Sequence, residues 1–397
     1  MKTLLLTNEY PPYIYGGAGV HVDYISQALS SLCDVEIRCF GDQNIHSKHL
    51  KVKGYPPITS NYSVPKPLHR VFDAIDRCIR FCDDNIDANL VHVHTWYTHF
   101  AGILAKINYS IPLVVTVHSL EPLRPWKKEQ LGEGYNFSTW VEKTALETAD
   151  AVIAVSQQTK QNILELFRVR EDKIHVIPNG IDPEEYKPVK ESESIEKLGV
   201  NPDKPYILFV GRITRQKGII HLVNAIQHMD RNFQIVLCAT APDTKEIKEE
   251  MESHIKEAQK THPQIIWIKQ MVDKPSLIAL YSHASVFCCP SLYEPFGIIN
   301  IEAMACETPV VATSTGGIKE AVEDGRTGFL VPVKMKGHSP ADPEQFSLDL
   351  ATKINTLMKD EKLREVFGKA GRKRVIENFT WRSVAEKTFS IYKGIAT

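Results

Sequence analysis

The chain alternates short apolar runs with amphipathic helical patterns, and it does so twice along its length. In the first half, apolar runs such as Lys2–Thr7, Leu90–His94 and Leu113–His118 are each followed by a helical pattern. A polar, proline-bearing stretch at 181–204 interrupts the alternation, which restarts at Tyr206–Val210. Strands separated by helices build parallel sheets that are covered on both faces. The sequence therefore predicts an α/β protein with two Rossmann-like domains.

The expected domains are 1–180 and 205–380, joined by a linker at 181–204. A length of 397 residues fits two domains. Their facing surfaces form a cleft in which a ligand is expected. In open parallel sheets, ligands bind beyond the carboxyl ends of the strands, so candidate site residues are sought there.

Charge and composition exclude several classes of partner. The 47 basic and 48 acidic residues nearly cancel, so no global field favours nucleic acid or an anionic membrane. No apolar run is long enough to span a bilayer, and Met1-Lys2 leads directly into a strand rather than a signal peptide. The eight cysteines are scattered and are interpreted as reduced thiols of a cytoplasmic protein.

The stretch Pro290–Cys306 contains two carboxylates and a glycine at the expected junction between a strand and a helix. Glu294 lies in the loop, Gly297 begins the helical pattern and Glu302 lies within it. A helix start offers free N–H groups and a positive dipole end to a phosphate, while the acids can accept hydrogen bonds from hydroxyls. A nucleotide sugar would suit such a site. The alternative is two solvated glutamates on a surface helix.

A second basic and glycine-rich stretch, Gly211–Gly218, follows the first strand of the second half. Arg212 and Lys217 beside a helix start would neutralise a pyrophosphate, although a basic turn in water is the alternative. Gly316-Gly317 also lies between a strand and a helix, as a phosphate approach or a plain turn.

The first half carries weaker signals. Gly16-Gly17-Ala18-Gly19 follows the first strand and lets the backbone approach a phosphate, but it is not a dinucleotide fingerprint. His118 ends a buried strand, where it is either functional or structural. Three histidines near the preceding strand lack carboxylate or cysteine partners at ligand spacing, so a metal site is not expected there. They are His92, His94 and His99.

Glu294 and Glu302, with seven residues between them, and Gly211–Gly218 resemble the signature of retaining GT-B glycosyltransferases of family 4. His118–Tyr135 is similar to the actinobacterial-type glycogen synthases of that family. Two further stretches share that similarity: Ala241–Thr244 and Ala303–Pro309. The resemblance runs along nearly the whole chain. It implies a GT-B fold whose C-terminal helix, within 381–397, crosses back onto the first domain.

The resemblance also implies roles for particular residues. Arg212 and Lys217 would hold the donor diphosphate, Glu302 the ribose hydroxyls and Glu294 the transferred sugar. His118 would lie beside the glucosyl unit. The remaining expected donor contacts are the backbone of Gly16 and Gly17, the amides of Gly297, Ile298 and Ile299, and, for the base, Met271 and Val272.

The implied activity is glycogen (α-1,4-glucan) synthesis: retaining transfer of glucose from ADP-glucose to the nonreducing end of a glucan, with no cofactor and no metal. Another family 4 transfer is the alternative, namely maltose-1-phosphate synthesis or the use of UDP-glucose or a sugar-phosphate acceptor. Two other classes stay open: a noncatalytic glycan-binding protein and an NAD-dependent oxidoreductase. One departure from the neighbouring starch synthases is that Ile14-Tyr15-Gly16-Gly17 lacks their Lys-x-Gly-Gly lysine.

Overall fold

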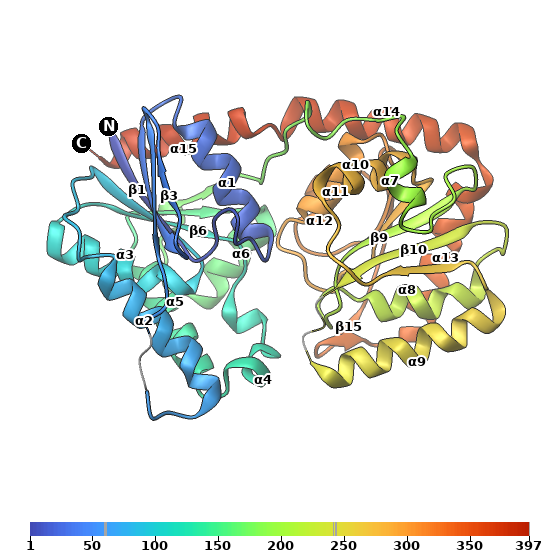
Figure 1. Cartoon of the computed structure of the whole chain (residues 1–397), viewed down its shortest axis with the longest axis horizontal. Coiled ribbons are helices and arrows are strands. Elements are labelled where there is room, and N and C mark those ends of the chain that lie inside the picture. The colour runs from blue at the N-terminus through green and yellow to red at the C-terminus, as the bar shows by residue number, and fades with distance from the viewer. Residues whose placement is uncertain (59–61, 241, 243, 397) are drawn as a thin grey trace. The chain divides into compact units, whose positions relative to one another are not determined.

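The computed structural model describes residues 1–58, 62–240, 242 and 244–396. The chain divides into two compact units, one formed by Met1–Gly180 with Trp381–Thr397 and the other by Ile181–Thr380 (Figure 1). Among the described residues, no helix has the length and apolar character needed to cross a bilayer. All eight cysteines are described, and each is a free thiol.

The first unit is built on an eight-stranded sheet in the order β3-β4-β2-β1-β5-β6-β7-β8. Every pairing is parallel except that of β3 with β4. The strands are β1 (Lys2–Thr7), β2 (Asp34–Phe40), β3 (Asn44–His46), β4 (Leu50–Tyr55), β5 (Leu90–His94), β6 (Leu113–Val117), β7 (Ala151–Ala154) and β8 (Ile174–Val176). The order runs away from β1 in two directions, so the topological switch point lies between β1 and β5, where ligands bind in such sheets.

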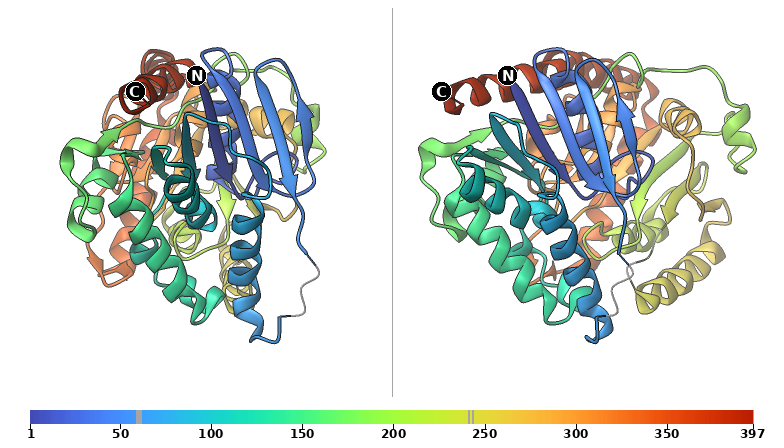
Figure 2. Two further views of the ribbon diagram at one scale, coloured as in Figure 1. Left: turned by 90° about the vertical axis from the view of Figure 1, so that its left-hand side faces the viewer. Right: turned by 60° about the vertical axis from the view of Figure 1, so that its left-hand side comes forward.

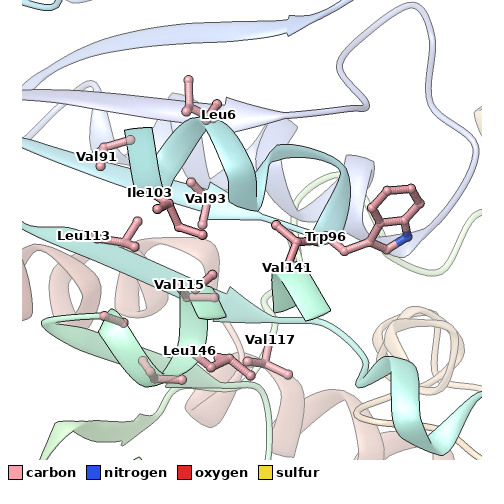
Figure 3. Packing of buried hydrophobic residues seen from close by; sticks show 14 of the residues in the cluster. Leu6, Val91, Val93, Trp96, Ile103, Leu113, Val115, Val117, Val141 and Leu146 are labelled. Atoms are coloured by element: carbon pink, nitrogen blue, oxygen red, sulfur yellow. The ribbon is translucent and has the colours of Figure 1, made fainter. Parts of the chain in front are cut away.

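The strands of this sheet are apolar because both faces are covered. The α-helices of the unit are α1 (Gly17–Leu29), α2 (His69–Arg80), α3 (Trp96–Tyr109), α4 (Lys127–Leu131), α5 (Gly134–Thr148), α6 (Gln157–Leu166) and α15 (Trp381–Ile395); the 3-10 turns are η1 (Lys66–Leu68), η2 (Glu121–Leu123) and η3 (Glu171–Lys173). Figure 3 shows Val93 and Leu113 of neighbouring strands pointing towards Ile103 of α3. Gly102 permits this close approach, since a Cβ there would lie 2.4 Å from Val93 Cγ1. Burying each such Val or Leu side chain stabilises the fold by about 1.5–3 kcal/mol.

Helix α15 belongs to the first unit although it ends the chain. It packs against α1, and the Trp381 ring stacks on Tyr24 with 5.5 Å between ring centroids. Tyr392, fully buried, lies with its hydroxyl 2.5 Å from Nδ1 of His92 in the sheet. Both views in Figure 2 show α15 beside the strand that begins the chain. The C-terminal segment therefore completes the core of the N-terminal unit.

The second unit has a parallel six-stranded sheet in the order β11-β10-β9-β12-β13-β14. Its strands are β9 (Tyr206–Arg212), β10 (Gln234–Thr240), β11 (Ile265–Ile268), β12 (Val286–Cys289), β13 (Val310–Thr313) and β14 (Gly328–Val331), and the pair β15 (Met335–Lys336) and β16 (Ser339–Pro340) forms a separate ribbon. Its helices are α7 (Glu193–Glu196), α8 (Ile219–Ala225), η4 (Ile226–His228), α9 (Lys245–Thr261), α10 (Lys274–His283), α11 (Ile298–Ala305), α12 (Ile318–Ala321), α13 (Pro343–Lys359) and α14 (Glu361–Asn378). The switch point lies between β9 and β12.

The two sheets, parallel except for the β3–β4 pair, confirm the predicted α/β architecture, and several local predictions need correction. The stretch 41–68, for which no strand is predicted from the sequence, supplies β3 and β4 to the first sheet, while residues 59–61 lie outside the described part. Residues 181–204, expected as a linker, include α7 and belong to the second unit. Arg212 ends β9 rather than following it. The family-like stretch Ala241–Thr244 is only partly described, since 241 and 243 lie outside it.

Candidate functional site

Two loops meet at the switch point of the second unit. One follows β9 and runs to Gly218, and the other follows β12 from Pro290 to Gly297. The amide of Leu292 donates to the carbonyl of Gln216 over 2.9 Å, which joins the loops directly. The adjacency of β9 and β12 thus brings together two stretches that lie far apart in the sequence.

Lys217 and Glu294 face each other across this junction. Lys217 Nζ lies 2.5 Å from Glu294 Oε2, and the two side chains are 16% and 9% exposed. Ser291 Oγ donates to the same carboxylate oxygen over 3.1 Å. A carboxylate this enclosed requires such partners, because an unpaired charge is costly to bury. The Lys217 ammonium could instead bind a diphosphate, and the Glu294 carboxylate could accept a hydrogen bond from a sugar hydroxyl.

Glycines allow the loops around Glu294 to pack without a gap. Gly218 has φ +61°, and a Cβ there would lie 2.1 Å from the carbonyl oxygen of Pro290. Gly316, with φ +50°, would place a Cβ 1.9 Å from the carbonyl oxygen of Glu294. The amide of Gly317 donates to that same oxygen over 3.0 Å. Gly316-Gly317 therefore supports the backbone of Glu294.

Replacing Gly316 with alanine is expected to abolish most of the activity that depends on Glu294, because the new methyl would push the Glu294 backbone out of place. Gly325 is the matched control, since it also has positive φ (+72°) but has open space around the Cβ position. Gly325→Ala should cost about 1–2 kcal/mol of unfolding free energy from backbone strain alone and keep its activity. Urea unfolding and kcat measured on both variants test this. Equal activity loss in both would show that the contact with Glu294 does not matter.

Glu302 lies inside α11 and faces the interior of the second unit. It is 7% exposed, and Tyr281 donates its hydroxyl to Glu302 Oε2 over 2.9 Å. Burial raises the pKa of Glu302 to about 7, and the hydrogen bonds from Tyr281 and Tyr186 oppose that rise. A carboxyl group with a pKa near 7 changes charge in the physiological range. Binding of hydroxyl donors would favour its ionised form.

The other residues expected in this site surround the same edge. Arg212 is half-buried at the end of β9. Gly297 caps α11 with φ +87°, and the amides that begin a helix have no partner within it, so those of Ile298 and Ile299 can serve an anion. Met271 is 81% exposed and contacts Thr240 Oγ1 through its sulfur at 3.7 Å. Val272 lies beside it in the loop between β11 and α10.

In the first unit, Glu9 organises the glycine turn after β1. Its Oε2 accepts the amides of Tyr15 and Gly16, each over 2.8 Å. A Cβ on Gly19 would lie 2.7 Å from that oxygen, so only glycine at position 19 leaves room for the Glu9 side chain. A Cβ on Gly16 would meet nothing within 4 Å. The amide of Gly16 is thus occupied by Glu9, whereas Gly17 begins α1.

His118 belongs to a cluster of imidazoles at the carboxyl edge of the first sheet. Its Nε2 lies 3.0 Å from Nδ1 of His94, and the ring of His21 is 4.7 Å away between centroids. His21 Nδ1 in turn lies 2.8 Å from Asn179 Oδ1. Burial lowers the pKa of His94 and of His118 well below the ordinary value and that of His21 to about 4. One nitrogen from each of the three rings lies within 4.8 Å of the others, so these neutral imidazoles could also hold a transition-metal ion.

The loop after His118 is anchored by buried carboxyl groups. Glu142 accepts the amide of Glu121 over 2.9 Å, and Ser138 Oγ donates to Glu121 Oε2 over 3.0 Å. Burial, and next the neighbouring Glu121, raise the pKa of Glu142 well above its ordinary value. Arg124 Nη1 lies 3.6 Å from Glu121 Oε1 and donates to Ser119 Oγ over 3.1 Å. These contacts hold the loop that follows His118 in one conformation.

Two family models match the chain, "Glycosyltransferase Family 4" over residues 15–185 and "Glycosyl transferases group 1" over 190–374. The chain is 42% identical over 404 residues to the alpha-maltose-1-phosphate synthase of Mycolicibacterium smegmatis, with all of both chains covered. It is 43% identical over 400 residues to the enzyme of the same name from Mycobacterium tuberculosis, again covering all of both. The chain belongs to the family 4 glycosyltransferases.

Its fold is similar to that of sucrose-phosphate synthase from Thermosynechococcus elongatus. The TM-score is 0.80 at 25% identity, with 99% of each chain covered. This similarity confirms that the two sheets form a GT-B glycosyltransferase, an enzyme that transfers sugar.

Several candidate residues of this family 4 glycosyltransferase were not found from its sequence. Glu9, His21, Tyr281 and Ser291 reach the sites through tertiary contacts. The contact between His94 and His118 does not follow from the sequence, because a histidine within an apolar strand carries no local pattern that identifies its partner. His94 ends β5 opposite Thr116 of β6, two residues before His118, and this position is the signal that could have found the contact, since residues at the carboxyl ends of paired parallel strands are neighbours.

Proposed function

We propose that the chain is an α-maltose-1-phosphate synthase, which transfers glucose from a nucleotide-glucose, such as ADP-glucose, to α-glucose 1-phosphate with retention. The contact between Lys217 and Glu294 at the switch point carries the assignment of the donor site. The name of the two full-length relatives favours this product over a longer glucan.

In this proposal Arg212, Lys217 and the amides of Gly297, Ile298 and Ile299 hold the diphosphate. The bond between the glucosyl C1 and the β-phosphate oxygen breaks, and negative charge grows on that phosphate. Fixed positive groups stabilise the charge as it appears. The acceptor oxygen forms the new bond to C1 on the same face, and its proton passes to the leaving phosphate. The products are the nucleoside diphosphate and maltose 1-phosphate.

The remaining residues of each unit have the following proposed roles. Glu294 accepts a hydrogen bond from the transferred sugar, Glu302 binds the ribose hydroxyls, and His118 contacts the glucosyl unit. Met271 and Val272 lie where a base could rest, and the Gly17 amide can face phosphate or sugar. The cationic side chains supply the charge that a metal would, so activity is expected to survive a chelator.

Incubation with ADP-glucose or UDP-glucose, each with glucose 1-phosphate or with glycogen, tests the proposal. A disaccharide phosphate should form, together with one equivalent of nucleoside diphosphate. Elongation of glycogen without any disaccharide phosphate would instead support glycogen synthesis. Glycan binding without nucleotide release would indicate a noncatalytic protein, and NAD binding an oxidoreductase.

Donor affinity is expected to fall as the pH drops below about 7. Glu302 is protonated below its raised pKa of about 7, whereas ribose hydroxyls bind the carboxylate better. The KM for the nucleotide sugar should therefore rise between pH 7.5 and 6 in the native protein. Glu302→Gln should have a high KM that does not vary over this range. Glu250→Gln serves as the control. Glu250 forms a partly exposed ion pair with Arg215, and this variant should keep the native pH profile of KM.

A further inference from the structure

We propose that His94 is a positioning residue that fixes the protonation of His118, so that His118 presents an Nδ1–H donor to the substrate. The proposal rests on the proposed function for its activity readout, but its spectroscopic readout is independent of the reaction. His118 thereby acts as a hydrogen-bond donor to a hydroxyl or phosphate oxygen and not as the base that deprotonates the acceptor.

The geometry allows two arrangements of the proton between the rings. His94 Nδ1 and His118 Nε2 lie 3.0 Å apart, so one of these nitrogens carries the hydrogen and the other accepts it. Burial keeps both rings neutral at pH 7. In a neutral imidazole, the nitrogen used in one contact decides the state of the other. The choice at this contact therefore decides what His118 offers on its Nδ1.

The surroundings of His94 Nε2 decide between these two arrangements of the proton. Its Nε2 is enclosed and has no hydrogen-bond partner among the described residues. If His118 donated, the neutral His94 would have to carry its hydrogen on Nε2, leaving an enclosed N–H without an acceptor. Among buried backbone groups, an orphaned N–H is rarer than an under-satisfied carbonyl, and we apply the same order to the ring nitrogens. We therefore place the hydrogen on His94 Nδ1, which makes His118 Nε2 an acceptor and its Nδ1 a donor.

The surrounding groups do not offer a competing proton. His21 from α1, His92 from β5 and His99 from α3 are the titratable groups whose charge acts on His94 and His118. His92 is fully engaged, since its Nε2 lies 2.7 Å from Thr116 Oγ1 and its Nδ1 contacts Tyr392. No carboxylate acts on either ring among these groups. A proton added to the pair would be a buried charge without a counter-ion.

Two substitutions separate positioning from packing. His94→Phe keeps a ring but removes the donor, and we expect kcat for glucosyl transfer to fall about 10- to 100-fold, as for other groups that orient a histidine. His94→Asn offers an amide N–H near the position of Nδ1 and should recover most of that loss. The KM for the donor should change less than kcat in both. Equal activity of the Phe and Asn variants, with both folded, would overturn the proposal.

Nitrogen NMR of the full chain labelled at histidine gives the direct test, without substrate. The His118 signals, assigned by their loss in His118→Gln, should show a protonated Nδ1 and an unprotonated Nε2 at pH 7. In His94→Phe the preference should weaken or reverse. A protonated Nε2 in the native protein would overturn the proposal. So would stoichiometric binding of Zn²⁺ that is abolished by His21→Gln, because an ion would then replace the shared hydrogen.

Discussion

Replacing Lys217 with alanine is expected to lower kcat about 10²–10³-fold, as loss of one preorganised donor to a developing anion does elsewhere. Lys217 contributes the charge nearest to Glu294, at 2.5 Å, and the loop connection from Gln216 to Leu292 fixes its direction. Donor depletion under saturating acceptor measures the effect. Arg215→Ala is the matched control, because Arg215 is a cation two residues away that is 55% exposed and pairs with Glu250. Its loss should leave kcat within about twofold, since exposed pairs contribute at most about 1 kcal/mol.

The same substitution leaves Glu294 charged, enclosed and short of a partner. Breaking a buried ion pair from one side can cost about 3–5 kcal/mol, so stability must be followed together with activity. Glu294→Gln in the Lys217→Ala background removes the unpaired charge and should recover stability without recovering kcat. If kcat recovered with stability, Lys217 would be a folding residue. If Lys217→Ala turned over at the native rate, the assignment of the diphosphate site would be wrong.

The neighbourhood of Lys217 and Glu294, which we propose as the donor site, could be predicted from the sequence because both residues follow the ends of strands. Glu294 and Lys217 each follow a buried apolar run, and carboxyl ends of parallel strands share one edge. What the sequence could not provide is the strand order. The contact between them exists because β9 neighbours β12, with β10 and β11 on the other side. Neither apolar run encodes its neighbour in a local pattern.

The histidine cluster shows a second limit of sequence reasoning. Hydrophobic alternation predicts that His94 lies in a buried strand, and a buried histidine is usually satisfied by local partners. Its actual partner, His118, follows a different strand, while His21 comes from α1. The glycine turn shows the same limit, since Glu9 occupies the Gly16 amide and Gly19, not Gly16, is sterically required. Such side-chain contacts depend on tertiary packing.

The first unit is expected to unfold sharply as the pH falls from about 6.5 towards 4.5. Burial lowers the pKa of His21 to about 4 and those of His92 and His99 to about 3, and it lowers those of His94 and His118 well below the ordinary value. The unfolded chain therefore binds up to five more protons at these sites once the pH is below their ordinary pKa of about 6.5. Where the unfolded state binds more protons than the native state, the free energy of unfolding falls as the pH is lowered. The fall is about 1.4 kcal/mol per pH unit for each extra proton.

Glu142 opposes this trend, because its raised pKa means that the native state holds a proton there that the unfolded chain releases. Four net protons remain, or about 5 kcal/mol per pH unit near pH 5.5, against a typical total stability of about 5–15 kcal/mol. Urea unfolding at pH 7.5, 6.5 and 5.5 measures the slope through tryptophan fluorescence. Four of the five tryptophans report on the first unit: Trp96, Trp126, Trp140 and Trp381.

One substitution assigns part of that slope to a single ring. Both nitrogens of His99 are enclosed without a partner among the described residues. His99→Phe should therefore reduce the slope by about 1.4 kcal/mol per pH unit, because it removes one of the extra protons. Exposed His46 provides the control, and His46→Asn should leave the slope unchanged. An unfolding midpoint that stays constant from pH 7.5 to 5.5 would show that the cluster is already protonated in the native protein, contrary to its burial.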